Sequence, residues 1–232
     1  MSVKPSSTLY SHPFSKAYWR DAAGEFRDVR ILIFTALMIA LRLILKSVKI
    51  PVAPSLNINI QFFVNALGSM VYGPVVALLA GAVSDTLGYL LFPSGPYFPG
   101  FLLTEMAGGL IFALFLYRAK ITPVRVILSR FSVNFLVNIV LQTPIMMAYY
   151  QIMLGKSYKV FHLPRIIKNL VMFPIESVLL IVFLRLLIPP MTQAGQLPKG
   201  MNKLAFTKRN ITVLVILTLI GAAAVAAYVI TR

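Results

Sequence analysis

Long apolar stretches separated by short polar segments dominate the pattern of this chain. A helix needs about 20 mostly apolar residues to cross the hydrocarbon core of a membrane. The pattern predicts seven such helices, over Ile31–Val48, Ile58–Tyr72, Val75–Phe92, Phe101–Tyr117, Val124–Tyr149, Ile166–Ile188 and Ile211–Ile230. Only Gly73 and Pro74 separate the second stretch from the third, so we expect a tight helical hairpin there. The chain is therefore predicted to be an all-α integral membrane protein.

The composition supports a membrane protein. Hydrophobic residues make up 59% of the chain and charged residues 12%, with a formal net charge of +16. Soluble domains are about half apolar and a quarter charged. A nucleic-acid-binding protein would carry its cations on a polar surface, which this chain lacks. The absence of cysteine also excludes disulfides, zinc fingers and cysteine nucleophiles.

The basic residues indicate the orientation. Most of them fall in residues 1–30, 118–125 and 185–209, which share one side of the membrane in the predicted topology. Because cytoplasmic loops are enriched in Lys and Arg, we expect a multi-pass protein of the cell membrane with its N-terminus in the cytoplasm. Tyr18 and Trp19 are typical of a short helix in the headgroup layer.

These patterns divide the chain into four parts. We predict a cytoplasmic or interfacial N-terminal segment (1–30), a six-helix membrane domain (31–188), a cytoplasmic linker (189–209) and an additional transmembrane helix (210–232).

A basic cluster lies on the side that the positive-inside rule disfavours. Its members are Lys156, Lys159, Arg165 and Lys168. The cluster is a candidate anion site, and contact with phospholipid headgroups explains it equally well.

Three acidic residues, Asp85, Glu105 and Glu176, fall inside predicted spans. Each is costly there unless it is paired or hydrated. Asp85 and Glu105 lie toward the outer surface, which suggests a polar cavity open to the outside. Structural pairing with Arg42 or Arg130 is the alternative.

The fifth predicted helix carries a polar face. Asn134, Asn138 and Gln142 are spaced by four residues and so point the same way. Such amides either join helices or line a ligand site, and the three in line favour a lined cavity. The next helix begins with Arg165, Lys168 and Asn169, where cations could hold a carboxylate.

Two further features remain ambiguous. The loop Phe92–Gly100 has three prolines and two glycines and is expected to be rigid. Its Tyr97 and Phe98 either stack on an aromatic ligand or seal the bundle. Ala36 and Ala40 in the first helix allow a close approach of another helix.

Motifs of common enzymes are absent from the sequence. Gly155-Lys156-Ser157 resembles the end of a P-loop, but Tyr150 stands where the first glycine belongs. We expect no enzyme and no cofactor. A proton-coupled secondary transporter remains an alternative, since the three intramembrane carboxylates could relay protons.

Four segments of the sequence carry motifs of a known family: Gly73–Tyr89, Phe92–Phe101, Val133–Asn138 and Arg165–Glu176. They resemble the folate-family S component of energy-coupling factor (ECF) vitamin transporters, and the resemblance extends over about Arg30–Leu187. It implies a six-helix bundle that captures a vitamin at its outer face. It also implies a transmembrane coupling subunit and two cytoplasmic ATPase subunits as partners, with Ala36 and Ala40 docking on the coupling subunit. The seventh span lies outside the usual pattern.

The chemistry of the candidate residues favours folate, with pantothenate as the main rival. Glu105 suits the amino-amidine edge of a pterin, Tyr97 and Phe98 suit its ring, and Arg165 and Lys168 suit its glutamate carboxylates. Pantothenate needs no acidic partner and would suit Asn138 and Gln142. Gln142 stands where a typical folate member is expected to have Asn.

Overall fold

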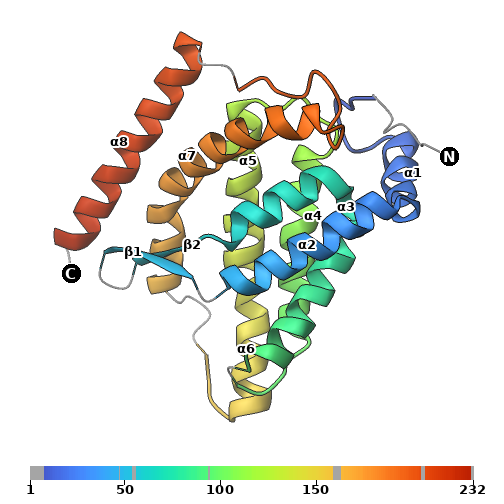
Figure 1. The fold of residues 1–232 in the computed structure, drawn as a ribbon. Helices are drawn as coiled ribbons and strands as arrows, with labels where there is room; N and C mark the ends of the chain where they lie inside the picture. The colour runs from blue at the N-terminus through green and yellow to red at the C-terminus, as the bar shows by residue number, and fades with distance from the viewer. Residues whose placement is uncertain are drawn as a thin grey trace.

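The computed structural model describes residues 8–46, 48–53, 56–93, 95–158, 163–204 and 207–230. The chain is mainly helical (Figure 1). Its helices are α1 Lys16–Gly24, the 3₁₀ turn η1 Glu25–Arg27, α2 Val29–Leu45, α3 Gln61–Leu91, α4 Gly100–Leu116, α5 Pro123–Ser132, the π-helical stretch η2 Val133–Leu141, α6 Gln142–Leu154, α7 Leu163–Gln193 and α8 Lys208–Ile230. Two strands, β1 Lys49–Ala53 and β2 Leu56–Asn59, form an antiparallel hairpin.

Within the described residues, four helical segments are long and apolar enough to cross a membrane: 61–91, 123–154, 165–193 and 210–228. The apolar helix α4 is shorter. The predicted all-α membrane protein with a seventh, C-terminal helix is therefore confirmed. The predicted spans Ile58–Tyr72 and Val75–Phe92 form one element, α3, with a break inside it.

The break in α3 lies at Gly73, where the sequence predicted a tight helical hairpin; the prediction of a hairpin is wrong, because the helix is kinked at this residue and continues to Leu91. Gly73 has φ 75° and ψ 179°, a conformation that side-chain-bearing residues rarely adopt, and Pro74 follows it. A Cβ at Gly73 would also lie 3.0 Å from the ring of Tyr117. The two halves of α3 leave this point in different directions (Figure 1).

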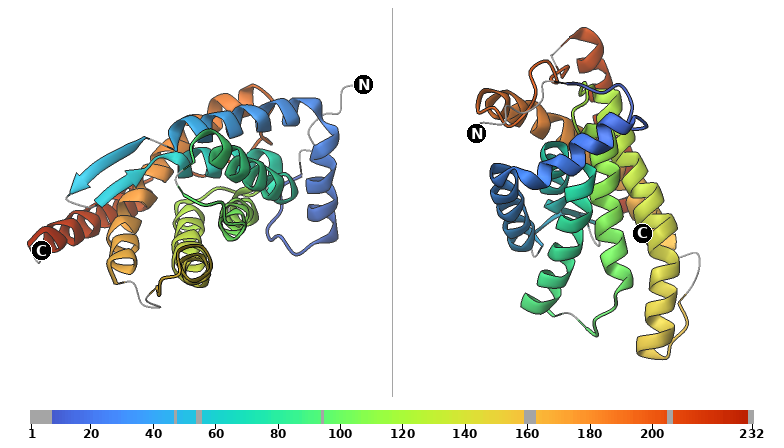
Figure 2. Two further views of the ribbon diagram at one scale, coloured as in Figure 1. Left: turned by 90° about the horizontal axis from the view of Figure 1, so that it is seen from below. Right: turned by 90° about the vertical axis from the view of Figure 1, so that its right-hand side faces the viewer.

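The second half of α3 packs closely on α4. A Cβ at Gly81 would lie 2.8 Å from the backbone of Met106, and one at Gly109 would lie 3.1 Å from the carbonyl oxygen of Ala77. The glycines thus let the two backbones approach, as small residues do in membrane helix pairs. Alongside α4, the helix from α5 through η2 to α6 runs as one long rod (Figure 2).

The structure contains two local features that the sequence did not lead us to expect. The hairpin β1–β2 pairs Ile50 with Ile58 and precedes α3, so residues 58–60 are not helical. The predicted fifth helix contains the π-helical stretch η2, whose widened turns include Asn134 and Asn138. Such stretches occur often at functional sites.

The N-terminal segment lies on the bundle itself. Tyr18 is 1% exposed and its hydroxyl donates to the carbonyl oxygen of Ala113 at 3.1 Å. Arg118 forms ion pairs with Asp21 and Glu25, both at 2.8 Å. The ring and hydroxyl of Tyr18 therefore contact the bundle itself, at α4. Trp19 stays 40% exposed.

The residues after α7 also pack on this end of the bundle. Helix α7 continues through Pro189 to Gln193, beyond the predicted start of the linker. Leu197 and Met201 are buried, and Met201 accepts a hydrogen bond from the backbone N–H of Ile121 at 2.8 Å. Helix α8 then packs mainly along α7 (Figure 1), with Gly221 against Ile175.

Candidate functional site

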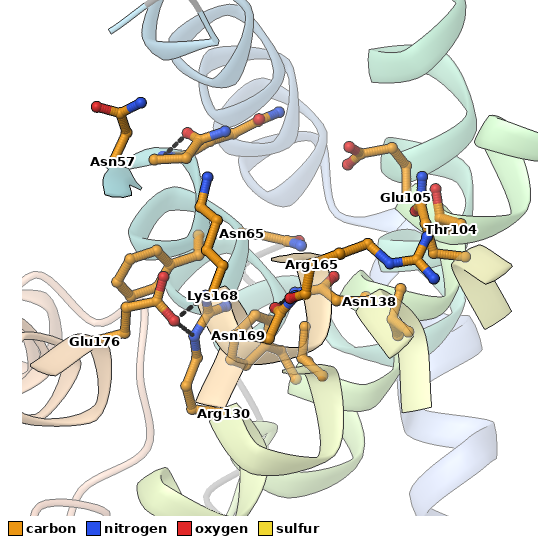
Figure 3. A pocket seen from close by; sticks show the side chains of 18 of the residues that line it. Asn57, Asn65, Thr104, Glu105, Arg130, Asn138, Arg165, Lys168, Asn169 and Glu176 are labelled. Carbon is orange, nitrogen blue, oxygen red and sulfur yellow. Dashed lines mark hydrogen bonds and ion pairs between the residues drawn. The ribbon is translucent and has the colours of Figure 1, made fainter. Parts of the chain in front are cut away.

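A polar cavity of about 400 Å³ lies between β2, α3, α4, η2, α6 and α7. It is lined by residues 104–112 of α4 and 165–176 of α7, whereas α1 packs near the C-terminal end of α4 and residues 194–204 follow the C-terminal end of α7. Glu105 from α4, Asn138 from η2, and Arg165 and Lys168 from α7 point into it (Figure 3). Its size is in the range of small-molecule sites. A polar cavity, as the sequence predicted, is thus present.

Arg130 and Glu176 form a buried pair at one side of the cavity. Both nitrogens Nε and Nη2 of Arg130 donate to Oε2 of Glu176, at 3.1 and 2.7 Å. The guanidinium also lies over the ring of Phe62, 4.2 Å from its centroid. The alternative of structural pairing therefore holds for Glu176, whose charge is compensated within the bundle.

The amides of the fifth helix both join helices and line the cavity. Asn138 donates to Asn134 Oδ1 at 3.2 Å and to Asn169 Oδ1 at 3.0 Å. Asn134 is only 4% exposed and donates to Glu176 Oε2 at 3.2 Å. Of the predicted face, Asn138 and Gln142 line the cavity whereas Asn134 lies behind it. Asn134 thus supports the site from behind, contrary to our expectation that it faces the ligand.

Arg165 and Lys168 bring positive charge to the cavity. Arg165 donates through Nη2 to the hydroxyl of Thr143 and lies 5.8 Å from the ring centroid of Tyr158. Its Nε and Nη1 are buried and have no hydrogen-bond partner among the described residues. In the same part of the chain no carboxylate lies within ion-pair distance of Lys168. Both cations are therefore available to an anionic ligand.

Glu105 is shared between the cavity and α2. Its Oε2 accepts a hydrogen bond from Nη2 of Arg42, which is 1% exposed. The Glu105 side chain is still 33% exposed and lines the cavity. Glu105 therefore both pairs with Arg42 through one oxygen and faces the cavity, so the two alternatives considered for it, structural pairing and a cavity-lining position, apply together.

An adjoining cavity of about 290 Å³ holds the aromatic residues of the proline-rich loop. Tyr97 packs on Tyr89 with ring centroids 5.0 Å apart, and Phe98 packs on Tyr149 at 5.8 Å. Asp85 and Lys46 line the same cavity. Thr104, Glu105 and Gln142 line both cavities, so the two adjoin along these residues. Tyr97 and Phe98 are therefore next to the main cavity, not inside it.

Several residues that line the main cavity were not predicted from the sequence to line it. They are Arg42, Asn57, Asn59, Gln61, Asn65, Thr104 and Tyr158. Asn57 and Asn59 alternate with apolar residues in β2, and that period of two was the available signal. Lys159 of the predicted basic cluster lies outside the described residues, and Lys156 is exposed and does not line either cavity.

Comparisons with known proteins assign the chain to a family. A family model described as the S component of ECF-type riboflavin transporters matches residues 27–188. The chain belongs to the family of ECF transporter S components. It is therefore a transporter subunit in the membrane and not an enzyme, and it works with an energy-coupling module of a transmembrane subunit and ATPases.

Individual S components resemble the chain over most of their length. The Folate transporter FolT of Clostridium novyi is 34% identical over 154 residues, 66% of this chain and 87% of that protein. FolT of Leuconostoc mesenteroides is 30% identical over 151 residues, 64% of this chain and 81% of that protein. A crystal structure of FolT bound with folic acid matches with a TM-score of 0.55 and 31% identity, covering 65% of this chain and 89% of that one.

Proposed function

We propose that this chain is the folate-binding S component of an ATP-driven ECF uptake transporter. The observation that carries the proposal is the charge of the main cavity. Four cationic and two anionic side chains line it, and Arg42 and Arg130 are paired with the two carboxylates. Arg165 and Lys168 therefore remain as two uncompensated positive charges.

A ligand with two carboxylates neutralises these two cations. The glutamate part of folate has two, pantothenate has one, and riboflavin has none. Because a partly buried cation without a counter-ion is unfavourable, the dianion is the best match to the cavity. The family model is named for riboflavin and the relatives for folate; the cavity charge supports the name that the relatives carry.

The remaining groups suit the other parts of folate. Glu105 keeps one carboxylate oxygen without a hydrogen bond among the described residues, and it can accept donors from the amino-amidine edge of a pterin. Tyr97 and Phe98 provide aromatic surface next to it. Asn138, Gln142 and Asn169 offer amide donors and acceptors along the cavity. This placement puts the glutamate of folate at Arg165 and Lys168 and its pterin toward Glu105.

The proposed topology places the N-terminus in the cytoplasm and the cavity outside. Residues 8–27, 117–122 and 194–204 then share the cytoplasmic end. There the backbone N–H of Tyr10 donates to the carbonyl oxygen of Arg118, and that of Ile121 donates to the carbonyl oxygen of Met201. The basic segments that the positive-inside rule assigns to the cytoplasm lie at this end. Uptake by an S component requires this orientation.

Ala36 and Ala40 of α2 are proposed to contact the coupling subunit. Both are exposed and lie four residues apart, so they form a small-residue strip on the exposed face of the helix, which another helix can approach closely. The secondary-transporter alternative is not favoured, because Glu105 and Glu176 are held in ion pairs and S components obtain their energy from ATPases.

Calorimetry on the purified chain in detergent tests the function. We expect folate to bind without ATP, and pantothenate and riboflavin to bind at least about tenfold more weakly, because they leave one or both cations uncompensated. Binding of riboflavin or pantothenate in preference to folate would contradict the proposal. Binding of none of the three well above micromolar concentrations would also contradict it.

A further inference from the structure

The acidic side chains at the N-terminal end of the chain all bind to other groups of the protein. Three of the six acidic residues of the chain precede α2: Asp21, Glu25 and Asp28. Asp21 and Glu25 form ion pairs with Arg118, both at 2.8 Å. They also accept hydrogen bonds from the hydroxyls of Tyr10 and Tyr117, at 2.8 and 2.7 Å. Asp28 caps α2 by accepting from the backbone N–H of Arg30 at 2.9 Å.

The basic side chains of the same segment face outward instead. Lys16 and Arg20 lie one helical turn apart on α1 and are exposed. Arg27 in η1 and Lys120 after α4 are exposed as well. Tyr18 faces the other way and is buried against the bundle. None of the four cations forms an ion pair among the residues that the structure describes. The surface around α1 is therefore positively charged.

Two large aromatic side chains lie among these cations. Phe14 is 88% exposed and Trp19 is 40% exposed. Trp19 follows Lys16 by three residues and precedes Arg20, so all three share one side of α1. An aromatic ring beside exposed cations is typical of a helix in the headgroup layer, where the ring reaches the acyl chains and the cations meet phosphate.

The neighbouring helices place this surface at the level of the headgroups. Exposed apolar side chains begin directly after η1 on α2, where Val29 is 65% exposed, and at the start of α5, where Val124 is 50% exposed. Because such side chains on a membrane helix face acyl chains, the hydrocarbon core begins near these residues. Helix α1 packs on the last turn of α4, since the Tyr18 hydroxyl donates to the carbonyl oxygen of Ala113. It lies at the edge of the bundle (Figures 1 and 2).

We propose that α1 and η1 form a binding surface for anionic phospholipids, with Lys16, Arg20 and Arg27 on the phosphates and Trp19 between the headgroups. The carboxylates that would repel phosphate are turned inward and held by Arg118. Each Lys or Arg near an anionic membrane surface favours binding by a factor of about five. The surface is separate from the ligand cavities, so the proposal does not depend on which vitamin the chain binds.

Quenching of Trp19 by brominated lipids tests the binding. Trp19 is the single tryptophan of the chain, so its fluorescence reports on α1 directly. The full chain is reconstituted in vesicles of four parts phosphatidylcholine to one part phosphatidylglycerol. Either the phosphatidylglycerol or an equal amount of phosphatidylcholine is brominated near the top of its acyl chains. We expect phosphatidylglycerol to associate with Trp19 at least about fivefold more strongly than phosphatidylcholine. Equal quenching by both lipids, or quenching by neither, overturns the proposal.

Substitution of the two cations of α1 tests their role. The double variant Lys16→Gln with Arg20→Gln should keep Trp19 in contact with lipid but lower the preference for phosphatidylglycerol to about twofold or less. Lys16→Arg with Arg20→Lys conserves both charges and should retain the preference. Lys156→Gln should also retain it, because this exposed cation follows α6, away from α1 (Figure 1). A preference that persists in the double Gln variant, or is lost in Lys156→Gln, overturns the role of the two cations.

The energy-coupling module is the other candidate occupant of this surface. If the cations bind lipid, the double Gln variant should bind the module with the affinity of the parent. Added salt should lower the preference of the parent for phosphatidylglycerol, because it screens exposed charges from the headgroups. Loss of module binding in the double Gln variant, together with no lipid preference in the parent, assigns the surface to a protein partner and overturns the proposal.

Discussion

Arg130 and Glu176, 46 residues apart in sequence, form a buried ion pair in which Nε and Nη2 of the arginine share one carboxylate oxygen, at 3.1 and 2.7 Å. Asn134 donates to the same oxygen at 3.2 Å. The pair joins α5 to α7 directly beside the ligand cavity. It therefore fixes α7, which carries Arg165, Lys168 and Asn169, against the helical rod that continues from α5 into η2 and α6.

Glu176→Gln is expected to destabilise the fold strongly. The substitution keeps the size of the side chain but leaves Arg130 buried without a counter-ion, which costs about 3–5 kcal/mol. Thermal unfolding in detergent measures the loss. Asp28→Asn is the matched control, because Asp28 caps α2 through its side chain and asparagine caps equally well. Equal melting temperatures for the Glu176→Gln variant and the parent would show that the pair contributes little.

Arg165→Ala and Lys168→Ala should each weaken folate binding by about 10- to 100-fold, since each removes a charged hydrogen bond to a carboxylate. Calorimetry with folate measures the change. The same variants should bind 6-methylpterin, which carries no carboxylate, with nearly the affinity of the parent. Lys156→Ala is the control from the same basic cluster, because Lys156 does not line either cavity. An equal loss for folate and 6-methylpterin would argue against glutamate recognition by these cations.

Gly81→Ala should destabilise the bundle by about 1–3 kcal/mol, because the added methyl group would lie 2.8 Å from the backbone of Met106. Gly24→Ala meets nothing within 4 Å and should be neutral or slightly stabilising. Thermal unfolding of the two variants side by side measures the difference. If both behave like the parent, α3 and α4 are not packed at backbone distance at this position.

Cysteine labelling in intact cells tests the orientation. Ser157 and Gln196 are both exposed, and the segments that carry them, after α6 and after α7, lie at opposite ends of the bundle (Figure 1). With the N-terminus in the cytoplasm, a membrane-impermeant maleimide should label Ser157→Cys in intact cells and Gln196→Cys only after permeabilisation. The cysteine-free parent chain is the control for background labelling. The reverse pattern would place the cavity on the cytoplasmic side and rule out an uptake function.

Removal of α8 should leave folate binding nearly intact. The residues that line the main cavity lie between positions 42 and 176, and α8, which packs mainly along α7, contributes none of them. A chain that ends after Thr207 should bind folate within about threefold of the parent, a difference of less than 1 kcal/mol. A chain that ends after Gln193 also loses the buried Leu197 and Met201 and should be less stable. A tenfold weaker affinity after removal of α8 alone would instead make α8 part of the binding unit.

Much of the fold could be predicted because the membrane imposes simple requirements on the sequence. Apolar length fixes which segments can span, so the long helices and the C-terminal α8 were predictable. The break in α3 was predictable from Gly73 and Pro74, since proline removes a helical hydrogen bond and glycine tolerates positive φ. The hairpin β1–β2 was not, because Ile58 was assigned to the next apolar stretch and pairing with Ile50 depends on contacts across the chain.

The candidate site was likewise predictable only in part from the sequence. The sequence alone determined that Asn138, Gln142, Arg165, Lys168 and Glu105 are polar groups in apolar surroundings, because such groups are costly in a membrane and need partners. Tertiary structure decided which partner each one has. Asn134 joins Glu176 behind the cavity, Glu105 pairs with Arg42, and Arg165 and Lys168 keep their charge for a ligand. The reason is physical: periodicity places a side chain on a face of its own helix, but only the packing of several helices determines which opposite charge lies within hydrogen-bond distance.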